Sequence, residues 1–223
     1  MYPANLYYKK SYFFGMKNMI VAGIAFLLAS CMGSSNENNT RTDTLRRDSL
    51  LSTVQPGNAL SPIDRSPMDM IYFPVDYPIL KTSGKAVNPP LARVIYSRPH
   101  RQGRTIFGSL VPYGQPWRLG ANEATEIELF APATIQNKPV AKGRYILYCI
   151  PQPKEWTIVF NNNLYTWGLQ TDSTQDAYRF TIPVAPTSKP LEDFTMVFIA
   201  AANGAELLVS WEQAEARLPI QFK

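Results

Sequence analysis

A group of arginines in the middle of the chain offers the residue types best suited to binding a ligand. Residues 77–122 contain seven basic side chains and no acidic one. A guanidinium group presents five N–H donors in a planar fork that matches a carboxylate or a phosphate. Glycines spaced through this stretch let a backbone approach a bound molecule closely. The sequence therefore predicts a pocket for an anion or an acidic sugar. Its candidate ligand-binding residues are Arg98, Arg104, Trp117, Arg118 and Asn122.

The same arginines also have an architectural interpretation. Residues 99–124 form an unusually long connection between two predicted strands, and the backbone polar groups of such a connection need hydrogen-bond partners. The arginines would then donate to turn carbonyls, or pair with Glu123, Glu126 and Glu128, and hold the connection in place. If they bind an anion instead, they should converge on one small ligand.

Catalytic motifs are scarce. Ser97 and His100 lie three residues apart, but Pro99 between them enforces an extended path. The chain has no Gly-x-Ser-x-Gly, no His-Glu-x-x-His and no phosphate-binding glycine loop, although a Ser-His-Asp triad is built through space and is invisible in a sequence. Glu126 and Glu128 lie on the wet side of one predicted strand, where solubilising charge is favoured over a pair of glycosidase carboxylates. No catalytic residue is predicted.

The counts of histidine and cysteine limit metal chemistry. With 1 His and 2 Cys, the chain has too few ligands for a multi-histidine centre or a four-cysteine zinc site. No metal and no cofactor is predicted. Cys149 lies within an apolar run, where a thiol behaves as a small hydrophobic side chain. We expect it to be buried, reduced and inert.

Tryptophans provide flat rings that can stack on sugars. Trp156 opens an apolar strand and is predicted to lie in the core. Trp117 and Trp167 lie beside turn residues, so a place in the core and a stacking role both remain open for them.

The elements that must position these residues are predicted to be β-strands. Short runs rich in β-branched and aromatic residues alternate with Pro, Gly and Asn, and no segment shows a sustained helical stripe. We expect an all-β domain in which two antiparallel sheets pack as a sandwich or jelly roll. The clearest predicted strands are 70–73, 92–96, 125–130, 145–150, 156–160, 178–182, 194–199 and 206–211.

The amino terminus has the features of an export signal. Three lysines precede the apolar run 19–29, which is too short to span a bilayer but fits the apolar region of a signal peptide. It ends in Leu28-Ala29-Ser30-Cys31, which resembles the bacterial lipobox. That resemblance implies cleavage before Cys31 and attachment of a lipid to its sulfur. A plain secretory signal with a coincidental cysteine is the alternative.

Three regions follow from this signal. Residues 1–30 are the predicted lipoprotein signal peptide, 31–66 the lipidated cysteine and a flexible polar linker, and 67–223 the β-domain. The predicted location is the bacterial cell envelope, with the lipid anchor in the membrane. Because Met32 follows Cys31 where an acidic residue would favour inner-membrane retention, the outer membrane is the expected site.

The net charge of +5 does not indicate nucleic-acid binding. The positive charge is concentrated in the signal and in residues 77–122, whereas residues 123–223 contain eight basic and eleven acidic side chains. No nucleic-acid partner is predicted.

The motifs between Tyr96 and Thr125 resemble those of a bacterial family catalogued as domain of unknown function 2911. They are Tyr-Ser-Arg-Pro, Gly-Arg-x-Ile-Phe-Gly, Val-Pro-Tyr-Gly, Trp-Arg-x-Gly-Ala-Asn and Ala-Thr, and the likeness extends over about 90–220. The resemblance implies a secreted or lipid-anchored β-domain. It supplies no reaction, and His100 lies at a position that the motif leaves open.

Two functions from different classes are consistent with these patterns. The favoured hypothesis is a lipid-anchored envelope protein whose non-catalytic domain binds an anionic or carbohydrate ligand or a protein partner. The alternative is a hydrolase acting on envelope polymers or sugars. A pocket of arginine and tryptophan without a nucleophile or paired carboxylates would favour the binding domain.

Overall fold

The computed structural model describes residues 64–85 and 88–222. The predicted signal peptide, Cys31 and nearly all of the linker lie outside the described residues. Within those ranges, no helix has the length and apolar character needed to cross a membrane.

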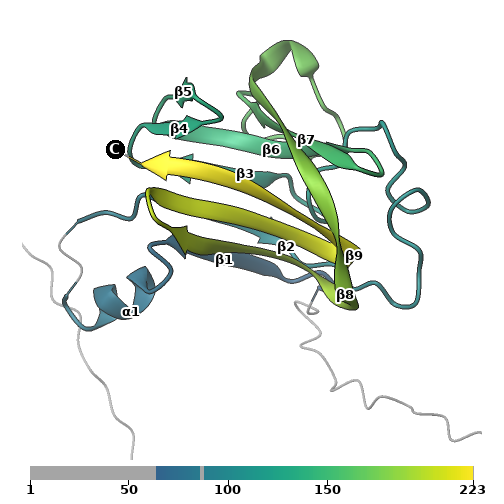
Figure 1. Cartoon of the computed structure of the whole chain (residues 1–223), viewed down its shortest axis with the longest axis horizontal. Helices are drawn as coiled ribbons and strands as arrows, with labels where there is room; N and C mark the ends of the chain where they lie inside the picture. Colours follow the sequence, from purple (N-terminus) through teal and green to yellow (C-terminus); the bar gives the residue numbers. More distant parts are fainter. Residues whose placement is uncertain (1–63, 86–87, 223) are drawn as a thin grey trace, which may run out of the picture. The chain divides into compact units, whose positions relative to one another are not determined.

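Nearly all of the regular structure is antiparallel β-sheet, which confirms the predicted all-β class (Figure 1). One short helix, α1, follows Pro74 and was not predicted. The elements are β1 (Met68–Phe73), α1 (Tyr77–Thr82), β2 (Ala92–Ser97), β3 (Thr125–Leu129), β4 (Ala133–Ile135), β5 (Lys138–Val140), β6 (Gly143–Pro151), β7 (Glu155–Asn161), the 3-10 helix η1 (Ser173–Gln175), β8 (Asp176–Ala201) and β9 (Gly204–Phe222).

Hydrogen bonds join nine strands into one open sheet in the order β1-β2-β3-β6-β7-β8-β9-β4-β5. The two predicted strands 178–182 and 194–199 are both parts of β8, which pairs with β7 up to Pro183 and with β9 from Val184 onward. Because β8 runs through the sheet without a break, the expected division into two separate sheets, as in a sandwich or jelly roll, is not confirmed.

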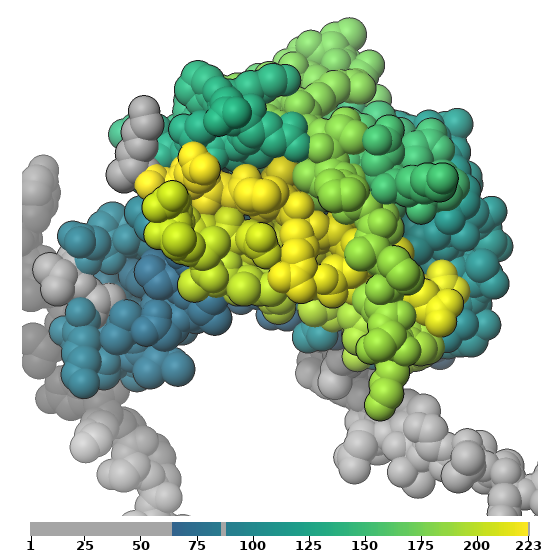
Figure 2. Space-filling model, in the orientation of Figure 1, coloured from purple at the N-terminus to yellow at the C-terminus, as the bar shows by residue number. Residues whose placement is uncertain are grey.

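Strand β9 doubles back on itself. Glu212 has a φ of 53°, and the Ser210 hydroxyl donates to the Ala214 carbonyl at 3.0 Å. A Cβ on Gly204 would lie 2.1 Å from the Ile220 carbonyl oxygen, so the two ends of β9 lie against each other. Figure 2 shows the side chains of β8 and β9 covering the front of the domain, with β4 and β5 above them.

Alternation along β3 produces one buried and one polar face, as the sequence predicts. Ile127 and Leu129 are buried, whereas Glu126 and Glu128 are partly exposed. Glu128 pairs with Arg93 of β2, and Glu126 pairs with Arg144 of β6, each at 2.5 Å. These two carboxylates are therefore engaged by arginines outside the predicted site.

The core lies where the sheet folds over, so that β1 and β2 face the second half of β8. Phe73 packs against Phe198 with ring centroids 6.0 Å apart, and Tyr96 packs edge-on against Phe194 at 5.6 Å. Central strand β6 is buried along most of its length. This rigid core supports the long connection between β2 and β3.

Candidate functional site

The connection between β2 and β3, residues 98–124, is anchored into the core. Ile106, Val111, Trp117 and Leu119 are buried. The backbone of Trp117 forms a two-way bridge with Cys149 of β6: the Trp117 N–H donates to the Cys149 carbonyl at 2.7 Å, and the Cys149 N–H donates back at 2.8 Å. The connection is therefore an ordered part of the domain.

The side chain of Ser97 hydrogen-bonds to the backbone near the end of this connection. The buried Ser97 hydroxyl accepts from the Ala121 N–H at 2.6 Å and donates to the Ala121 carbonyl. Gly120 passes so close that a Cβ there would lie 2.9 Å from both the carbonyl and hydroxyl oxygens of Ser97. Because Ser97 is buried and fully engaged, it is not available as a nucleophile.

A pocket of about 360 Å³ opens over the connection. This volume lies within the range of small-molecule sites. Three of the five predicted ligand-binding residues, Arg104, Trp117 and Arg118, meet here. The other described residues that line the pocket are Ser66, Pro99, Leu110, Val111, Gly120, Ala121 and Trp211.

Arg118 is the most unusual member of this pocket. Its Nε is buried and has no hydrogen-bond partner, and within residues 64–85 and 88–222 no carboxylate forms an ion pair with it. Burial lowers the pKa of its guanidinium from the usual value. Partial burial of a charge without a counter-charge is unfavourable, so an anion beside this guanidinium would be stabilising.

Arg104 has a mixed role. Its Nε donates to the Arg101 carbonyl at 2.8 Å, and its Nη2 donates to the His100 carbonyl. These bonds hold the turn at Gln102 and Gly103, both of which have positive φ. The remaining N–H groups of the Arg104 guanidinium can face the pocket.

The other two predicted polar residues do not line this pocket. Arg98 donates to the Phe194 carbonyl at 3.3 Å and pairs with Asp69 at 3.4 Å, so it joins the start of the connection to β1 and β8. Asn122 donates from its Nδ2 to an Asp64 carboxylate oxygen at 2.6 Å. Both side chains therefore make structural contacts, although with other partners than the turn carbonyls and glutamates expected for the arginines.

Trp117 lies at the floor of the pocket and is only 8% exposed. It stacks on Trp211 with centroids 6.0 Å apart and is contacted edge-on by Phe107 and Phe194. With its faces covered, Trp117 can offer an edge but not a stacking surface. Trp156 is buried as predicted, whereas Trp167 is 53% exposed.

The described lining of this pocket contains no acid–base pair. His100 bonds to Asp193 through Nδ1, but both side chains are partly exposed and neither lines the pocket. Among the described lining residues, Ser66 is the one whose side chain carries a hydroxyl group. Within residues 64–85 and 88–222, no group of three His, Cys, Asp or Glu residues is placed to hold a metal ion.

Trp211 and Ser66 were not predicted as site residues. Trp211 lies in β9, far along the chain, and the fold stacks its ring on that of Trp117. No local pattern marks such a residue, because its role depends on contacts between distant segments.

Together, the fold and the site define an all-β domain with a cationic pocket over an aromatic floor. Residues 81–220 match the family described as "Protein of unknown function (DUF2911)", and the chain belongs to this family. No curated protein and no solved structure matches the chain.

Proposed function

We propose that this chain is a lipid-anchored protein of the bacterial cell envelope whose β-domain binds a small anionic ligand, such as an acidic sugar, in the pocket at Arg118. The half-buried guanidinium of Arg118, which has no ion-pair partner among the described residues, carries this proposal. A carboxylate or phosphate would supply the missing counter-charge through charge-assisted hydrogen bonds.

The surroundings of Arg118 agree with a binding role. Arg104 adds a second positive charge, and Trp117 and Trp211 provide an apolar floor. Pockets of this kind fix a ligand with a few polar groups on a mostly apolar surface. The hydrolase alternative has no comparable support, since the described lining residues include no carboxylate and no histidine.

The anchor is supported by the sequence Leu28-Ala29-Ser30-Cys31 and by the apolar run before it. The polar residues after Cys31 suit a tether that holds the domain away from the membrane. The expected location is the outer membrane, because Met32 follows the cysteine.

Calorimetric titration of the full-length protein in detergent tests the pocket. The probes are galacturonate and inorganic phosphate, with galactose as the neutral control. We expect saturable binding of at least one anion and none of galactose. Arg118→Gln should weaken that binding by about tenfold or more, because a hydrogen bond to a charged group contributes about 1.5–3 kcal/mol.

Arg217→Gln is the matched control. Arg217 is an exposed arginine of β9 that pairs with Glu206 and Glu215 and does not line the pocket. Absence of binding by the unmodified protein, or equal weakening in both variants, would contradict the proposal.

A further inference from the structure

The connection between β7 and β8, residues 162–175, presents large apolar side chains to solvent. Tyr165 is 83% exposed, Trp167 53% and Leu169 68%, whereas the other three tryptophans of the chain are buried. This connection projects beyond the sheet at the top of Figure 1 and forms the protrusion at the top of Figure 2. Exposed apolar patches mark interaction sites, and three large apolar side chains exposed within five residues make this connection a candidate for one.

Tyr165 combines an uncommon backbone conformation with an exposed ring. Tyr165 has a φ of 64°, in the left-handed region that is unfavourable for a bulky residue. Its ring lies 5.5 Å from the guanidinium carbon of Arg144, in a cation–π arrangement. Burial does not compensate for this conformation, because the ring is exposed.

A polar hollow lies at the base of the same connection. Its volume is about 10 Å³, which is room for one water-sized group such as a hydroxyl. Asn163, Gln170 and Thr171 contribute polar side chains to its lining. Amide and hydroxyl groups are donors and acceptors that complement sugar hydroxyls.

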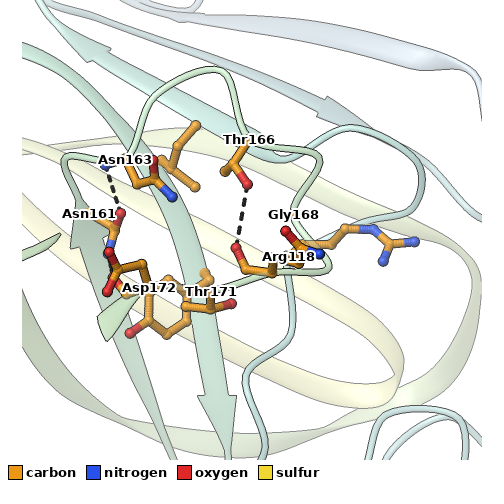
Figure 3. Close-up of a pocket in the computed structure, with 10 residues that line it drawn as sticks. Arg118, Asn161, Asn163, Thr166, Gly168, Thr171 and Asp172 are labelled. Atoms are coloured by element: carbon orange, nitrogen blue, oxygen red, sulfur yellow. Dashed lines mark hydrogen bonds between the residues drawn. The ribbon is translucent and has the colours of Figure 1, made fainter. Parts of the chain in front are cut away.

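Arg118 joins this hollow to the anion pocket, because it lines both. A Cβ on Gly168 would lie 2.9 Å from the Arg118 Cδ, so the backbone beside Trp167 rests on the arginine stem. Figure 3 shows the Arg118 guanidinium extending past Gly168 and away from Asn161 and Asp172. The exposed rings therefore lie on the segment that packs against the proposed anion-binding arginine.

We infer that residues 163–171 form a saccharide subsite and that the ligand of this domain is an acidic oligosaccharide. One acidic unit pairs with Arg118, and a neighbouring sugar ring stacks on Trp167 while a hydroxyl enters the polar hollow. This inference rests on the proposed anion-binding function. Polar side chains at the base of the connection and its contact with Arg118 favour a saccharide over a lipid surface.

The test compares galacturonate with its trimer on the full-length protein in detergent. We expect the trimer to bind about tenfold tighter, since stacking on an aromatic ring adds up to about 1.5 kcal/mol. Trp167→Ala should remove this advantage and leave the affinity for the monomer unchanged. Tyr113→Ala, which removes an exposed ring outside the subsite, should keep it.

Fluorescence gives a second readout that does not depend on affinity. Since Trp167 is the exposed tryptophan, acrylamide should quench mainly its emission, and the trimer should protect it. Trp167→Phe should lose both the quenching and the protection.

The outcomes separate the two proposals. If the unmodified protein binds neither galacturonate nor phosphate, the anion pocket and the subsite both fail. If the monomer binds through Arg118 but the trimer binds no tighter, or if Trp167→Ala keeps the advantage, only the subsite is overturned. Protection of Trp167 by anionic phospholipid vesicles in a Cys31→Ser variant, with none from the trimer, would assign the connection to a membrane surface and overturn the inference.

Discussion

The hydroxyl of Tyr96 bonds to both backbone polar groups of Met196. It donates to the Met196 carbonyl at 3.1 Å and accepts from the Met196 N–H at 3.1 Å, a hundred residues further along the chain. This contact ties β2, at the start of the long connection, to the half of β8 that covers the core. Burial is the main cause that raises the pKa of Tyr96 to about 12.

Tyr96→Phe should therefore lower the free energy of unfolding by about 1–3 kcal/mol, because two buried backbone groups lose their partner. Chemical denaturation followed by circular dichroism measures this loss. Tyr72→Phe, which changes a partly exposed hydroxyl on β1, is the control and should have little effect. Equal stability of the Tyr96 variant and the unmodified protein would show that the contact contributes nothing.

The same tyrosine predicts an alkaline loss of stability. Its pKa is about 12 in the folded domain against an ordinary value of 10.0, so folding favours the protonated form. The contribution of Tyr96 to the free energy of unfolding is complete below pH 10, and it disappears as the pH rises from 10 towards 12. It amounts to about 3 kcal/mol, at 1.36 kcal/mol per pKa unit. Burial also raises the pKa of Tyr148, so Tyr96→Phe should reduce the alkaline loss without removing it.

Arg118→Met should leave the melting temperature unchanged or raise it. The substitution keeps an apolar stem and removes a half-buried charge that has no partner among the described residues. Thermal melts without and with the anion that binds in the calorimetric titration measure the effect, and that anion should stabilise only the unmodified protein. A loss of about 2–5 kcal/mol in the variant would indicate instead that Arg118 holds the connection together.

Glu212→Ala should destabilise the domain by about 1–3 kcal/mol. One carboxylate oxygen of Glu212 accepts from the Ile106 N–H at 3.0 Å and from the Phe107 N–H at 3.4 Å, so its removal leaves two donors without a partner. Glu206→Ala is the comparison, since Glu206 pairs with the exposed side chain of Arg217 and accepts no backbone N–H within the described residues. A similar small effect of both substitutions in urea denaturation would contradict this role.

Cys149 should not react with a thiol reagent in the folded protein. The side chain is fully buried, and burial raises the pKa of its thiol well above the usual value. In a Cys31→Ser variant, Ellman's reagent should modify Cys149 only after denaturant is added. Fast modification of the native protein would place the thiol on the surface.

Cys31→Ala should release the protein from the membrane fraction and abolish labelling by a fatty-acid probe. The lipid would be attached to the sulfur atom of Cys31, and no other residue of the lipobox has a thiol that could replace it. Fractionation followed by immunoblotting measures the change, with Ser30→Ala as the control. Unchanged membrane association of the Cys31 variant would count against lipidation.

Local pattern was sufficient for several features of the domain. Strict alternation in residues 125–129 predicted which side chains of β3 face the core, because successive side chains of a strand point to opposite faces. The apolar runs around Cys149 and Trp156 predicted burial, which the structure confirms. Of the arginines that the basic stretch offered as candidates, Arg104 and Arg118 line one pocket, while their predicted role in binding stays a prediction.

The local sequence pattern could not predict which ion pairs form between distant segments. The sequence offered Glu126 and Glu128 as partners for the arginines of the connection, but Arg144 and Arg93 on the neighbouring strands occupy them. Which carboxylate meets which arginine depends on strand register, and register is set by the whole sheet. Among the described residues, Arg118 has no ion-pair partner.

By itself, therefore, the sequence determined the β-class, the family, the buried positions of the strands and the basic character of the long connection. Tertiary structure alone decided that Trp117 is buried while Trp167 is exposed, although both lie beside turns. It also decided that β8 and β9 belong to one open sheet. The physical reason is that strand periodicity is a local property of the chain, whereas the neighbours of a ring or a charge come from elements far apart in sequence, and only folding brings those elements into contact.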